Sequence, residues 1–382
     1  MPAARLERLT TPAATPSRRP LRVLHVDTEN GWRGGERQVV LLSRGLMALG
    51  DVNLVVARPD QPLAARSTDA GIATLGLTPA FEADPRAALA LRRAIWRHGI
   101  DIVHAHTAHA VALAALATLG SRVPFVAARR VDFPLRRNAG TRWKYQRAAA
   151  VIAVSQAVAN VVARAGLDMR VLVVPDGTDA RRPRQLASAD TLAALGIPRG
   201  APLVVQVAQL VPHKDPLTFV RAMAAVRARV PGVHGVLVGS GPLHDDVEQC
   251  IRDHGLGDVV HLAGYRNDAD QLLAAADVVT LSSREEGMGS VLLDALVFSR
   301  PVAATRAGGI PEIVRDGETG LLSAVGDAEA LGASIARLLM DRGLAGRMGS
   351  AARARAPEFS LEAMAMRTRE VYDEVLQRSF TG

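Results

Sequence analysis

The chain has 382 residues, of which 48% are hydrophobic and 22% charged, so its composition is that of a globular protein and excludes a disordered chain. This length is enough for two domains of ordinary size or three small ones. The single cysteine, Cys250, excludes an internal disulfide and any zinc site built from several cysteines.

The net charge of +8 is unevenly distributed along the chain. Residues 1–184 carry 27 Lys and Arg against 14 Asp and Glu, whereas the remainder carries 19 against 24. Arginine supplies nearly all of the positive charge, because the chain contains two lysines, Lys144 and Lys214. An anion bound by the second half would therefore have to be held by a few placed groups.

The first twenty residues contain prolines and arginines but no apolar run, which predicts a disordered tail and not an export signal. The longest apolar runs, such as Ala110–Leu119, are much shorter than the roughly 18 residues of a membrane-spanning helix. The sequence therefore predicts a cytoplasmic protein, either free or peripheral on the inner face of the plasma membrane.

Strand and helix patterns alternate through the first half. The expected strands are short apolar runs at Leu21–Asp27, Val52–Ala57, Asp101–His106, Pro124–Arg129, Val151–Ser155 and Val171–Pro175. Helical spacing of apolar residues predicts helices at Arg37–Leu49, Arg86–His98 and Ala110–Leu119. Such alternation is typical of a parallel sheet that helices cover on both faces.

A Pro-, Gly- and Arg-rich segment, Asp176–Gly200, is interpreted as a linker, after which the same alternation resumes. The expected strands here are Pro202–Ala208, Gly235–Ser240, Val259–Gly264, Val278–Ser282 and Pro301–Thr305. The expected helices are Pro216–Arg229, Leu243–His254, Asp268–Ala276, Val291–Phe298 and those that follow from about Ala328.

The predicted fold is α/β, with two Rossmann-like, doubly wound parallel-sheet domains that face a cleft. The predicted bounds are 21–183 for the N-terminal domain, 184–365 for the C-terminal domain, and 366–382 for a helix that packs back on the N-terminal domain. Because open parallel sheets bind ligands at the carboxyl ends of their strands, a binding site is expected in the loops that follow the strands.

Gly34 and Gly35 follow the first strand and precede a helix. Two glycines there let the backbone approach a ligand, and a helix N-terminus attracts an anion. A tight turn that starts the helix explains them equally well. With Gly31 they do not fit the dinucleotide pattern G-x-G-x-x-G.

Lys214 lies in the loop after the first strand of the second half, where its side chain can reach a phosphate in the cleft. The alternative is a solvated surface lysine, which its position and the rarity of lysine disfavour. Glu286 lies in a later loop beside Gly287, and Asp294 lies on the helix that follows. Their carboxylates can accept hydrogen bonds from sugar hydroxyls, although acids near a helix start also simply favour its dipole.

Asp268 and Asp270 form a D-x-D pair, which is a metal-binding pattern in some transferases, but they directly precede a helix and are interpreted as its cap. No metal and no other cofactor is expected. Gly308 and Gly309 end another strand before a helix, as Gly34 and Gly35 do.

Taken in order and spacing, the segments GGERQ, DIVHAH, VIAVS, VPDGTD, LVPHKDP, VGSGP, LAGYR, EEGMGSVLLDAL and GGIPEIV…DGETGLL resemble glycosyltransferase family 4, the group 1 transferases with a GT-B fold. The resemblance covers nearly the whole chain after the tail. It implies a retaining hexosyltransferase that moves a sugar from a nucleotide diphosphate donor, here expected to be a UDP-sugar, to a glycolipid, polysaccharide or other cell-envelope acceptor.

The resemblance also implies roles for single residues. Glu286 would bind hydroxyls of the donor sugar, Lys214 the diphosphate and Asp294 the ribose, while Arg266 would lie near the base. The glycines at four positions would approach the donor with their backbone: Gly34, Gly35, Gly308 and Gly309, with Gly287 beside Glu286.

Three residues depart from the family pattern. Asp294 replaces a glutamate, and Gln209 replaces an arginine that would carry one positive charge to the diphosphate. Arg130 stands where the family often has a histidine aimed at the donor sugar, and our hypothesis is that Arg130 supplies the charge that Gln209 lacks. The expected catalytic residues are therefore Glu286, Lys214 and Arg130.

The acceptor is expected to meet the first half, with His106, His109 and Asp132 as contacts, whereas His104 is expected to be structural. The segment Phe133–Arg147 mixes five basic residues with three aromatic ones, which suits an anionic membrane surface, although a solvated basic helix is the alternative. No nucleic-acid-binding module is present in the sequence.

Two other functions stay open at this point. One is a sugar-nucleotide epimerase of the same fold, which the E-x7-D pattern disfavours. The other is a non-catalytic protein that binds a sugar nucleotide, which the substitutions at 130, 209 and 294 would allow.

Overall fold

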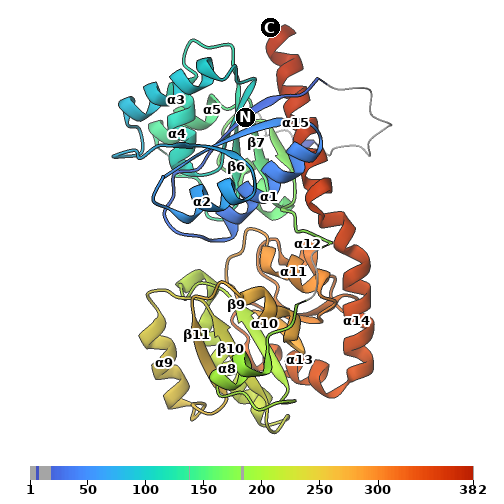
Figure 1. Cartoon of the computed structure of the whole chain (residues 1–382). Coiled ribbons are helices and arrows are strands. Elements are labelled where there is room, and N and C mark those ends of the chain that lie inside the picture. The colour runs from blue at the N-terminus through green and yellow to red at the C-terminus, as the bar shows by residue number, and fades with distance from the viewer. Residues whose placement is uncertain (1–5, 8–18, 137, 182–184, 382) are drawn as a thin grey trace. The chain divides into compact units, whose positions relative to one another are not determined.

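The computed structural model describes residues 6–7, 19–136, 138–181 and 185–381, which form two compact units (Figure 1). Unit 1 consists of Met1–Gly177 and Phe359–Gly382, and unit 2 of Thr178–Glu358. These bounds differ from the predicted domain limits of 183 and 365. Gln38 fixes the end of unit 1, because its side-chain amide donates to the Gly177 carbonyl at 2.8 Å and accepts from the Gly177 N–H at 3.0 Å.

Unit 1 contains a parallel sheet with the strand order β1-β8-β7-β6-β5-β2-β3-β4. Its strands are β1 (Leu6–Glu7), β2 (Arg22–Val26), β3 (Val52–Ala57), β4 (Ala73–Gly76), β5 (Ile102–Ala105), β6 (Phe125–Arg129), β7 (Ala150–Ala153) and β8 (Val171–Val173). Of the predicted tail, Leu6–Glu7 pairs with β8 and Arg19 binds Asp101, and the rest, residues 1–5 and 8–18, lies outside the described residues.

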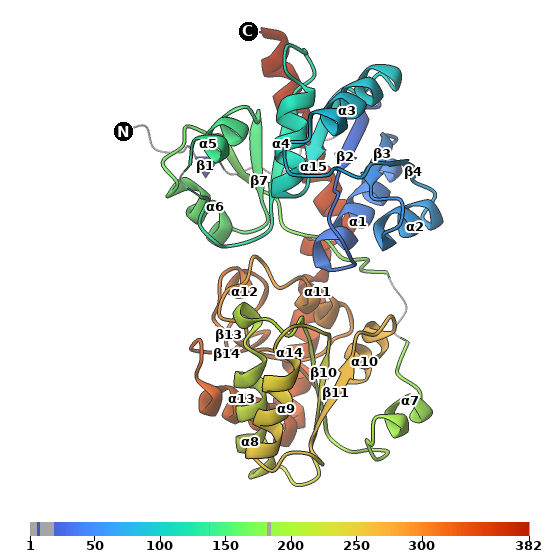
Figure 2. The same ribbon diagram turned by 90° about the vertical axis from the view of Figure 1, so that its left-hand side faces the viewer.

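The helices of unit 1 alternate with these strands. They are α1 (Gly34–Ala48), α2 (Pro62–Asp69), α3 (Pro85–Arg97), α4 (Ala108–Ala117), α5 (Ala139–Gln146), α6 (Gln156–Ala163) and α15 (Leu361–Thr381). Local sequence sets several of their starts: Thr107 and Ser155 cap α4 and α6 by accepting from the backbone N–H groups of Ala110 and Val158. Helices α3 and α4 lie side by side (Figures 1 and 2).

The last helix, α15, belongs to unit 1 although it follows unit 2 in sequence, and it lies beside α1. It begins at Leu361, earlier than the predicted 366. Its apolar residues Met364, Val371 and Tyr372 pack in one buried cluster with Leu42 and Leu46 of α1. Unit 1 is therefore built from two segments that are distant in sequence.

Unit 2 contains a second parallel sheet with the strand order β11-β10-β9-β12-β13-β14. Its strands are β9 (Leu203–Val207), β10 (His234–Val238), β11 (Val260–Gly264), β12 (Val278–Leu281), β13 (Val302–Thr305) and β14 (Gly320–Ser323). Its helices are α7 (Ala189–Ala194), η1 (Pro212–Lys214), α8 (Pro216–Arg227), α9 (His244–Asp253), α10 (Ala269–Ala275), α11 (Ser290–Val297), α12 (Ile310–Ile313), α13 (Ala328–Met340), α14 (Arg342–Arg355) and η2 (Ala356–Phe359).

The predicted fold class, two doubly wound parallel α/β sheets, is confirmed. Some elements differ from the expectation. The predicted linker contains the short helix α7, whose start Ser188 caps, and strand β4 was not predicted. Strand β4 has one neighbour, β3, and no buried side chain, so it lacks the apolar pattern of the interior strands.

Candidate functional site

Each sheet reverses its direction of growth at one place, and such switch points open a crevice at the carboxyl ends of the two strands involved. In unit 1 the reversal lies between β2 and β5, and in unit 2 between β9 and β12. The loops after these four strands carry most of the residues singled out above.

Lys214 and Glu286 meet at the switch point of unit 2. Lys214 ends the short 3₁₀ helix after β9, and Glu286 lies in the loop after β12. The Lys214 Nζ lies 2.5 Å from Glu286 Oε2, and the Ser283 hydroxyl donates to the same oxygen at 3.1 Å. The carboxylate is 9% exposed, so its partners and not water hold its charge. Two residues distant in sequence thus form one ion pair.

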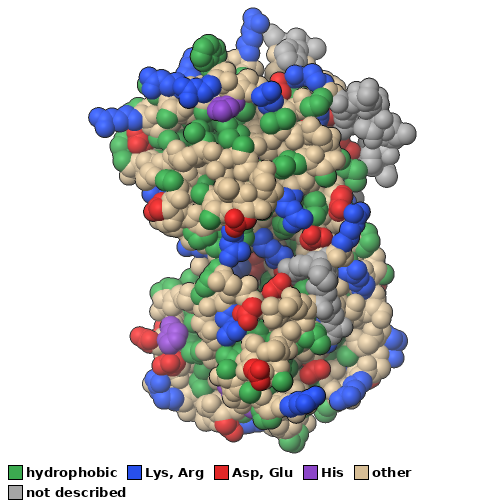
Figure 3. All heavy atoms as spheres, viewed as in Figure 1, with side chains coloured by type: hydrophobic (Ala, Val, Ile, Leu, Met, Phe, Trp, Pro, Cys, Tyr) green, Lys and Arg blue, Asp and Glu red, His purple; other side chains and the backbone are tan. Residues whose placement is uncertain are grey.

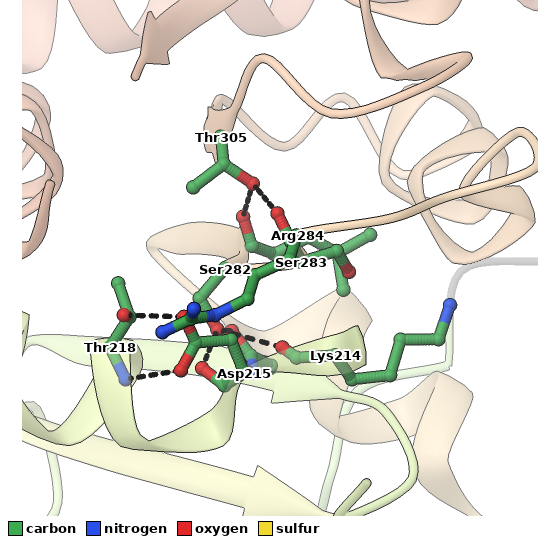
Figure 4. A network of polar contacts seen from close by, with 9 residues as sticks. Lys214, Asp215, Thr218, Ser282, Ser283, Arg284 and Thr305 are labelled. Atoms are coloured by element: carbon green, nitrogen blue, oxygen red, sulfur yellow. Dashed lines mark hydrogen bonds and ion pairs between the residues drawn. The ribbon is translucent and has the colours of Figure 1, made fainter. Parts of the chain in front are cut away.

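A polar network beneath this pair fixes the two loops (Figure 4). The Ser282 hydroxyl, on the β12 side, donates to the Asp215 carbonyl at 2.8 Å, and Arg284 Nε donates to Asp215 Oδ2 at 2.7 Å. The Thr305 hydroxyl donates to the Ser283 carbonyl at 2.6 Å. The Lys214 side chain extends away from this cluster, so the backbone is held while the ammonium group reaches outward.

Asp215 joins the Lys214 loop to the helix that follows. It adopts a left-handed conformation, with φ of 45°, and its carboxylate accepts from the N–H and the hydroxyl of Thr218. A left-handed non-glycine residue is strained, and its persistence here shows that the network specifies this turn. The sequence pattern did not reveal Asp215 or Ser282 as part of the site.

Asp294 lies on α11 and is 2% exposed, with the Thr178 hydroxyl donating to its Oδ1 at 2.8 Å. It thereby fixes the first residue of unit 2, and its predicted contact with a ribose stays a prediction. Gln209 is half-buried just after β9. Gly287 is buried beside Glu286.

Arg266 forms a two-point ion pair with Asp268, with nitrogen to oxygen distances of 2.8 and 2.7 Å. The hydrogen bonds from Arg266 lower the pKa of Asp268 below its usual range. Asp268 occupies the N-cap position of α10 but its side chain caps no N–H, so its interpretation as a side-chain cap is wrong. The contact of Arg266 with a base stays a prediction.

Gly309 differs from its predicted role as a donor-binding N–H. Its N–H donates to the Glu286 carbonyl at 3.0 Å, because the loop after β13 folds against the loop after β12. Gly309 therefore helps to hold Glu286 in place. The neighbouring Gly308 has a φ of 45°, which glycine adopts without strain.

In unit 1, Gly34 and Gly35 begin α1 after β2. A Cβ atom at Gly35 would meet nothing within 4 Å, so the packing of unit 1 does not explain why this residue is glycine. The Glu36 carboxylate accepts from the Arg33 N–H at 2.7 Å and completes the helix start. The open space at Gly35 is compatible with a ligand that approaches the backbone.

Three histidines lie together at the switch point of unit 1. His25 comes from β2, His104 from β5 and His106 from just after β5, and all three side chains are buried. His25 Nδ1 lies 2.9 Å from His106 Nε2, and His25 Nε2 lies 2.9 Å from Asn53 Oδ1. His104 Nδ1 lies 2.7 Å from the hydroxyl of Tyr372 on α15.

Arg130 lies beside this cluster, in the loop after β6. Its Nε donates to Asp176 Oδ1 at 3.1 Å, and its Nη1 donates to His106 Nδ1 at 3.1 Å. The side chain of His106 is 5% exposed and both of its ring nitrogens have partners within unit 1, and its contact with the acceptor stays a prediction.

The other two predicted acceptor residues are accessible. His109 is exposed, with its Nδ1 3.6 Å from Glu29, and Asp132 is half-buried in the loop after β6. Their roles stay predictions.

Burial shifts the pKa values at this edge of unit 1. It lowers the pKa of His25 to about 4 and holds those of His104 and His106 well below the usual value, so all three rings are neutral near pH 7. Burial, with Glu36 nearby, raises the pKa of Asp27 to about 7. Asp27 follows β2 and is a further buried carboxyl group that the sequence pattern did not single out.

The three histidines are close enough to be considered as metal ligands, since their ligand atoms lie within 4.8 Å of one another. Their contacts do not fit a bound metal. The facing nitrogens of His25 and His106 bond to each other, and the remaining nitrogen of His106 accepts from a permanent cation, Arg130. The cluster is therefore better described as a hydrogen-bonded network.

The predicted membrane segment, Phe133–Arg147, is exposed only in part. Lys144 is buried and donates to Glu82 and to the Ala108 carbonyl at 2.9 Å, and Tyr145 is 2% exposed. These two residues therefore belong to the interior of unit 1 and not to a membrane-facing surface. Among the described residues, no helix has the length and apolar character needed to cross a bilayer.

Two family models match the chain. "Glycosyltransferase Family 4" matches residues 32–182, and "Glycosyl transferases group 1" matches residues 188–355. Together they cover most of both units.

Among curated proteins, the chain is 35% identical over 156 residues to a lipopolysaccharide core biosynthesis glycosyltransferase of Rhizobium meliloti, which covers 41% of this chain and 45% of that protein. It is 33% identical over 286 residues to a D-inositol 3-phosphate glycosyltransferase of Nocardia farcinica, covering 71% and 60%. The chain spans about half the length of the first curated relatives that it matches.

Among solved structures, the fold matches HepE of Anabaena in complex with UDP and glucose, with a TM-score of 0.81 at 23% identity, covering 93% of this chain and 100% of that one. It also matches sucrose-phosphate synthase of Thermosynechococcus elongatus, with a TM-score of 0.78 at 20% identity, covering 94% and 100%.

Proposed function

This chain belongs to glycosyltransferase family 4, the group 1 transferases of GT-B fold, and we propose that it transfers a sugar from a nucleotide diphosphate donor to a cell-envelope acceptor with retention of configuration. The observation that carries the proposal is the pair of Lys214 and Glu286 at the switch point of unit 2.

The pair provides two of the functions that the reaction needs. The departing nucleoside diphosphate gains negative charge, and a preorganised ammonium group lowers the free energy of that state. Lys214 supplies this group, and Glu286 accepts hydrogen bonds from the sugar hydroxyls. Without a donor each neutralises the other, so donor binding exchanges one ion pair for contacts with phosphate and sugar.

The donor is proposed to be a UDP-sugar. HepE, which shares the fold, was solved with UDP-glucose, whereas a mannosyltransferase of Mycobacterium tuberculosis that is 35% identical over 161 residues is named as GDP-mannose-dependent. Whether the donor carries uracil or guanine is therefore the first property to test. The acceptor is proposed to be a lipid-linked or saccharide component of the cell envelope, as the name of the Rhizobium relative supports.

The test is a thermal-shift screen against UDP- and GDP-sugars, followed by an assay of nucleotide release with and without candidate acceptors. We expect one sugar nucleotide to raise the melting temperature and to be turned over. Binding without turnover across all acceptors would favour the non-catalytic alternative, and interconversion of the free sugar nucleotide would favour the epimerase. A melting temperature that no sugar nucleotide changes would contradict the proposal.

We also propose that unit 1 contacts an anionic membrane surface. Phe133 and Trp143 stay exposed in the predicted segment, and Trp96 on α3 is 86% exposed beside the exposed Arg93 and Arg97. Helices α3 and α5 both pack on α4, and basic side chains gather over α3 in Figure 3. Exposed aromatic rings among arginines suit the interface of an anionic bilayer.

Liposome flotation tests this contact. Trp96→Ala combined with Trp143→Ala should reduce binding to vesicles that contain phosphatidylglycerol, while Met340→Ala, an exposed apolar residue of unit 2, should not. Equal flotation of all three proteins, or none with the wild type, would contradict the membrane proposal without affecting the donor site.

A further inference from the structure

Arg130 is held from two directions at the carboxyl edge of the unit 1 sheet. Its Nε donates to Asp176, whose side chain is 7% exposed, and its Nη1 donates to His106. Two partners on different edges of a planar guanidinium fix both its position and its plane. The side chain of Arg130 keeps 15% of its surface exposed, so part of it remains accessible to a ligand.

The contact with Arg130 determines where the protons of the histidines are. A guanidinium has donors and no acceptor, so His106 Nδ1 must carry a lone pair. In a neutral ring the other nitrogen, Nε2, then carries the proton, and it donates to His25 Nδ1 at 2.9 Å. His25 therefore also carries its proton on Nε2, which donates to Asn53 Oδ1.

Asn53, at the other end of this series of hydrogen bonds, is oriented to accept the proton of His25. Asn53 donates from its Nδ2 to the Asp51 carbonyl at 3.2 Å, which places its amide oxygen, an acceptor, toward His25. Every N–H group between Arg130 and Asn53 thus faces an acceptor. The proton positions required by Arg130 at one end and by Asn53 at the other are therefore the same. Burial keeps the pKa values of both histidines low, which is consistent with neutral rings.

We propose that His25 and His106 are positioning residues for Arg130. As neutral Nε2–H tautomers they form a relay of hydrogen bonds, donated in one direction from Arg130 to Asn53, and this relay holds the guanidinium in position for the donor's charge. The proposal rests on the proposed function and on the hypothesis from the sequence that Arg130 supplies the positive charge that Gln209 lacks. It assigns to His106 a role through Arg130 in place of direct contact with the acceptor.

Two substitutions of His106 separate its nitrogens. Asparagine places its amide oxygen near the position of Nδ1, and can still accept from Arg130. Glutamine reaches the position of Nε2, and can still donate to His25, but it leaves Arg130 without this acceptor. Both side chains are polar, uncharged and no larger than the imidazole ring.

We expect His106→Gln to lower kcat about 10²-fold, as displacement of a catalytic group by about 1 Å does. Its KM should change little, because the charge that Arg130 faces grows in the transition state. His106→Asn should lose clearly less turnover than His106→Gln, because it keeps the acceptor for Arg130, but it should stay below the wild type, because it loses the hydrogen bond to His25. His261→Gln is the matched control, because His261 bonds to His234 at 2.9 Å in a similar pair that contacts no arginine in the described residues. It should behave as the wild type.

Equal losses in His106→Gln and His106→Asn would overturn the proposal and leave His106 a packing role. Wild-type turnover in both would overturn it as well. Arg130→Ala tests the role of Arg130 itself, separately from that of His106. If this variant turns over as the wild type does, Arg130 does not supply charge to the donor.

A measurement without turnover decides the relay itself. Nitrogen NMR of ¹⁵N-histidine-labelled protein at neutral pH should show Nε2 protonated and Nδ1 unprotonated in both His25 and His106, with unchanged signals after Zn²⁺ is added. A proton on His106 Nδ1 would overturn the relay, and a response of these rings to Zn²⁺ would show that they bind metal instead.

Discussion

Lys214 lies at the switch point of unit 2, where the donor is proposed to bind. It is one of two lysines in the chain, and the network of Asp215 and Ser282 holds its backbone while its Nζ reaches Glu286. The other lysine, Lys144, is buried in unit 1 against Glu82. Each lysine thus pairs with a glutamate, but of the two only Lys214 lies at a switch point of a sheet.

We predict that Lys214→Ala lowers turnover by about 10²–10³, the typical cost of removing one group that stabilises developing negative charge. Steady-state kinetics with the donor found in the screen measures the effect. Arg229→Ala, which removes a cation from an exposed pair with Glu329 after α8, is the control and should leave kinetics unchanged. Wild-type turnover in Lys214→Ala would refute the assignment.

Asp27 is a buried carboxyl group whose ionisation should make the stability of unit 1 depend on pH. Its folded pKa is about 7 and its ordinary value is 3.8, so the folded chain binds a proton more readily than the unfolded chain across this window. Stability is therefore lost as the pH rises through about 7. Asp27→Asn, which cannot ionise, should raise the melting temperature more at pH 8 than at pH 5. An increment that does not depend on pH would show that Asp27 does not titrate there.

Helix α15 is attached to unit 1 by a buried ion pair as well as by apolar packing. Arg369 is 4% exposed and donates to both oxygens of Asp51, and it also donates to the Arg19 carbonyl at 2.8 Å. Asp51 in turn accepts from the Leu21 N–H at 2.8 Å. The pair therefore joins the last helix to the residues that begin β2 and β3.

Arg369→Met should lower the free energy of unfolding by about 3–5 kcal/mol, because it leaves the Asp51 carboxylate buried without its cation. Urea denaturation followed on unit 1 measures this loss. Adding Asp51→Asn to Arg369→Met should recover part of it. If the double variant is no more stable than the single one, the cost arises from packing and not from the unpaired charge.

The elements that the sequence predicted well are the interior strands. Val52–Ala57 was predicted at its observed bounds, because a run of buried apolar residues is unambiguous in a parallel sheet. The edge strand β4 and helix α7 expose most of their residues and carry no such pattern. Unit 1 ends at Gly177, whose backbone Gln38 binds across the sequence, and no local signal reveals this contact.

The site was predictable where chemistry and loop position coincide. Lys214 and Glu286 are predicted from their loops after strands of the second half, and Arg130 from the position that it shares with a family histidine. The residues that orient them, Asp176, Asp215 and Asn53, act through contacts between distant segments. Period-two spacing does place His104 and His106 on one side of β5, but only the tertiary structure shows that His25 faces them.

At the scale of the molecule, the two units should differ in their sensitivity to acid. Unit 1 contains three buried histidines whose pKa values lie below the ordinary 6.5, that of His25 at about 4. The unfolded chain binds these protons first, so the three histidines destabilise unit 1 as the pH falls from about 6.5 toward 4, against the opposite effect of the single Asp27. Unit 2 has His234 and His261, which are less buried and whose pKa values are also lowered.

Hydrogen exchange at pH 7.5 and pH 5 measures this difference. Amides of β5 should lose more protection on acidification than amides of β9, because each unit opens with its own free energy. Equal loss in both strands would mean that the units unfold as one cooperative body. The free energy of unfolding could not then be divided between unit 1 and unit 2.

The position of α15 also sets an order of events during biosynthesis. A ribosome completes all of unit 2 before it makes the helix that unit 1 needs, so Tyr372, the partner of His104, is added only after unit 2 is complete. The segment that is translated first must therefore wait, with its sheet partly uncovered, while the segment translated second can already fold. A stop codon placed ahead of the codon for Tyr372 would consequently damage unit 1, although all of unit 2 is translated.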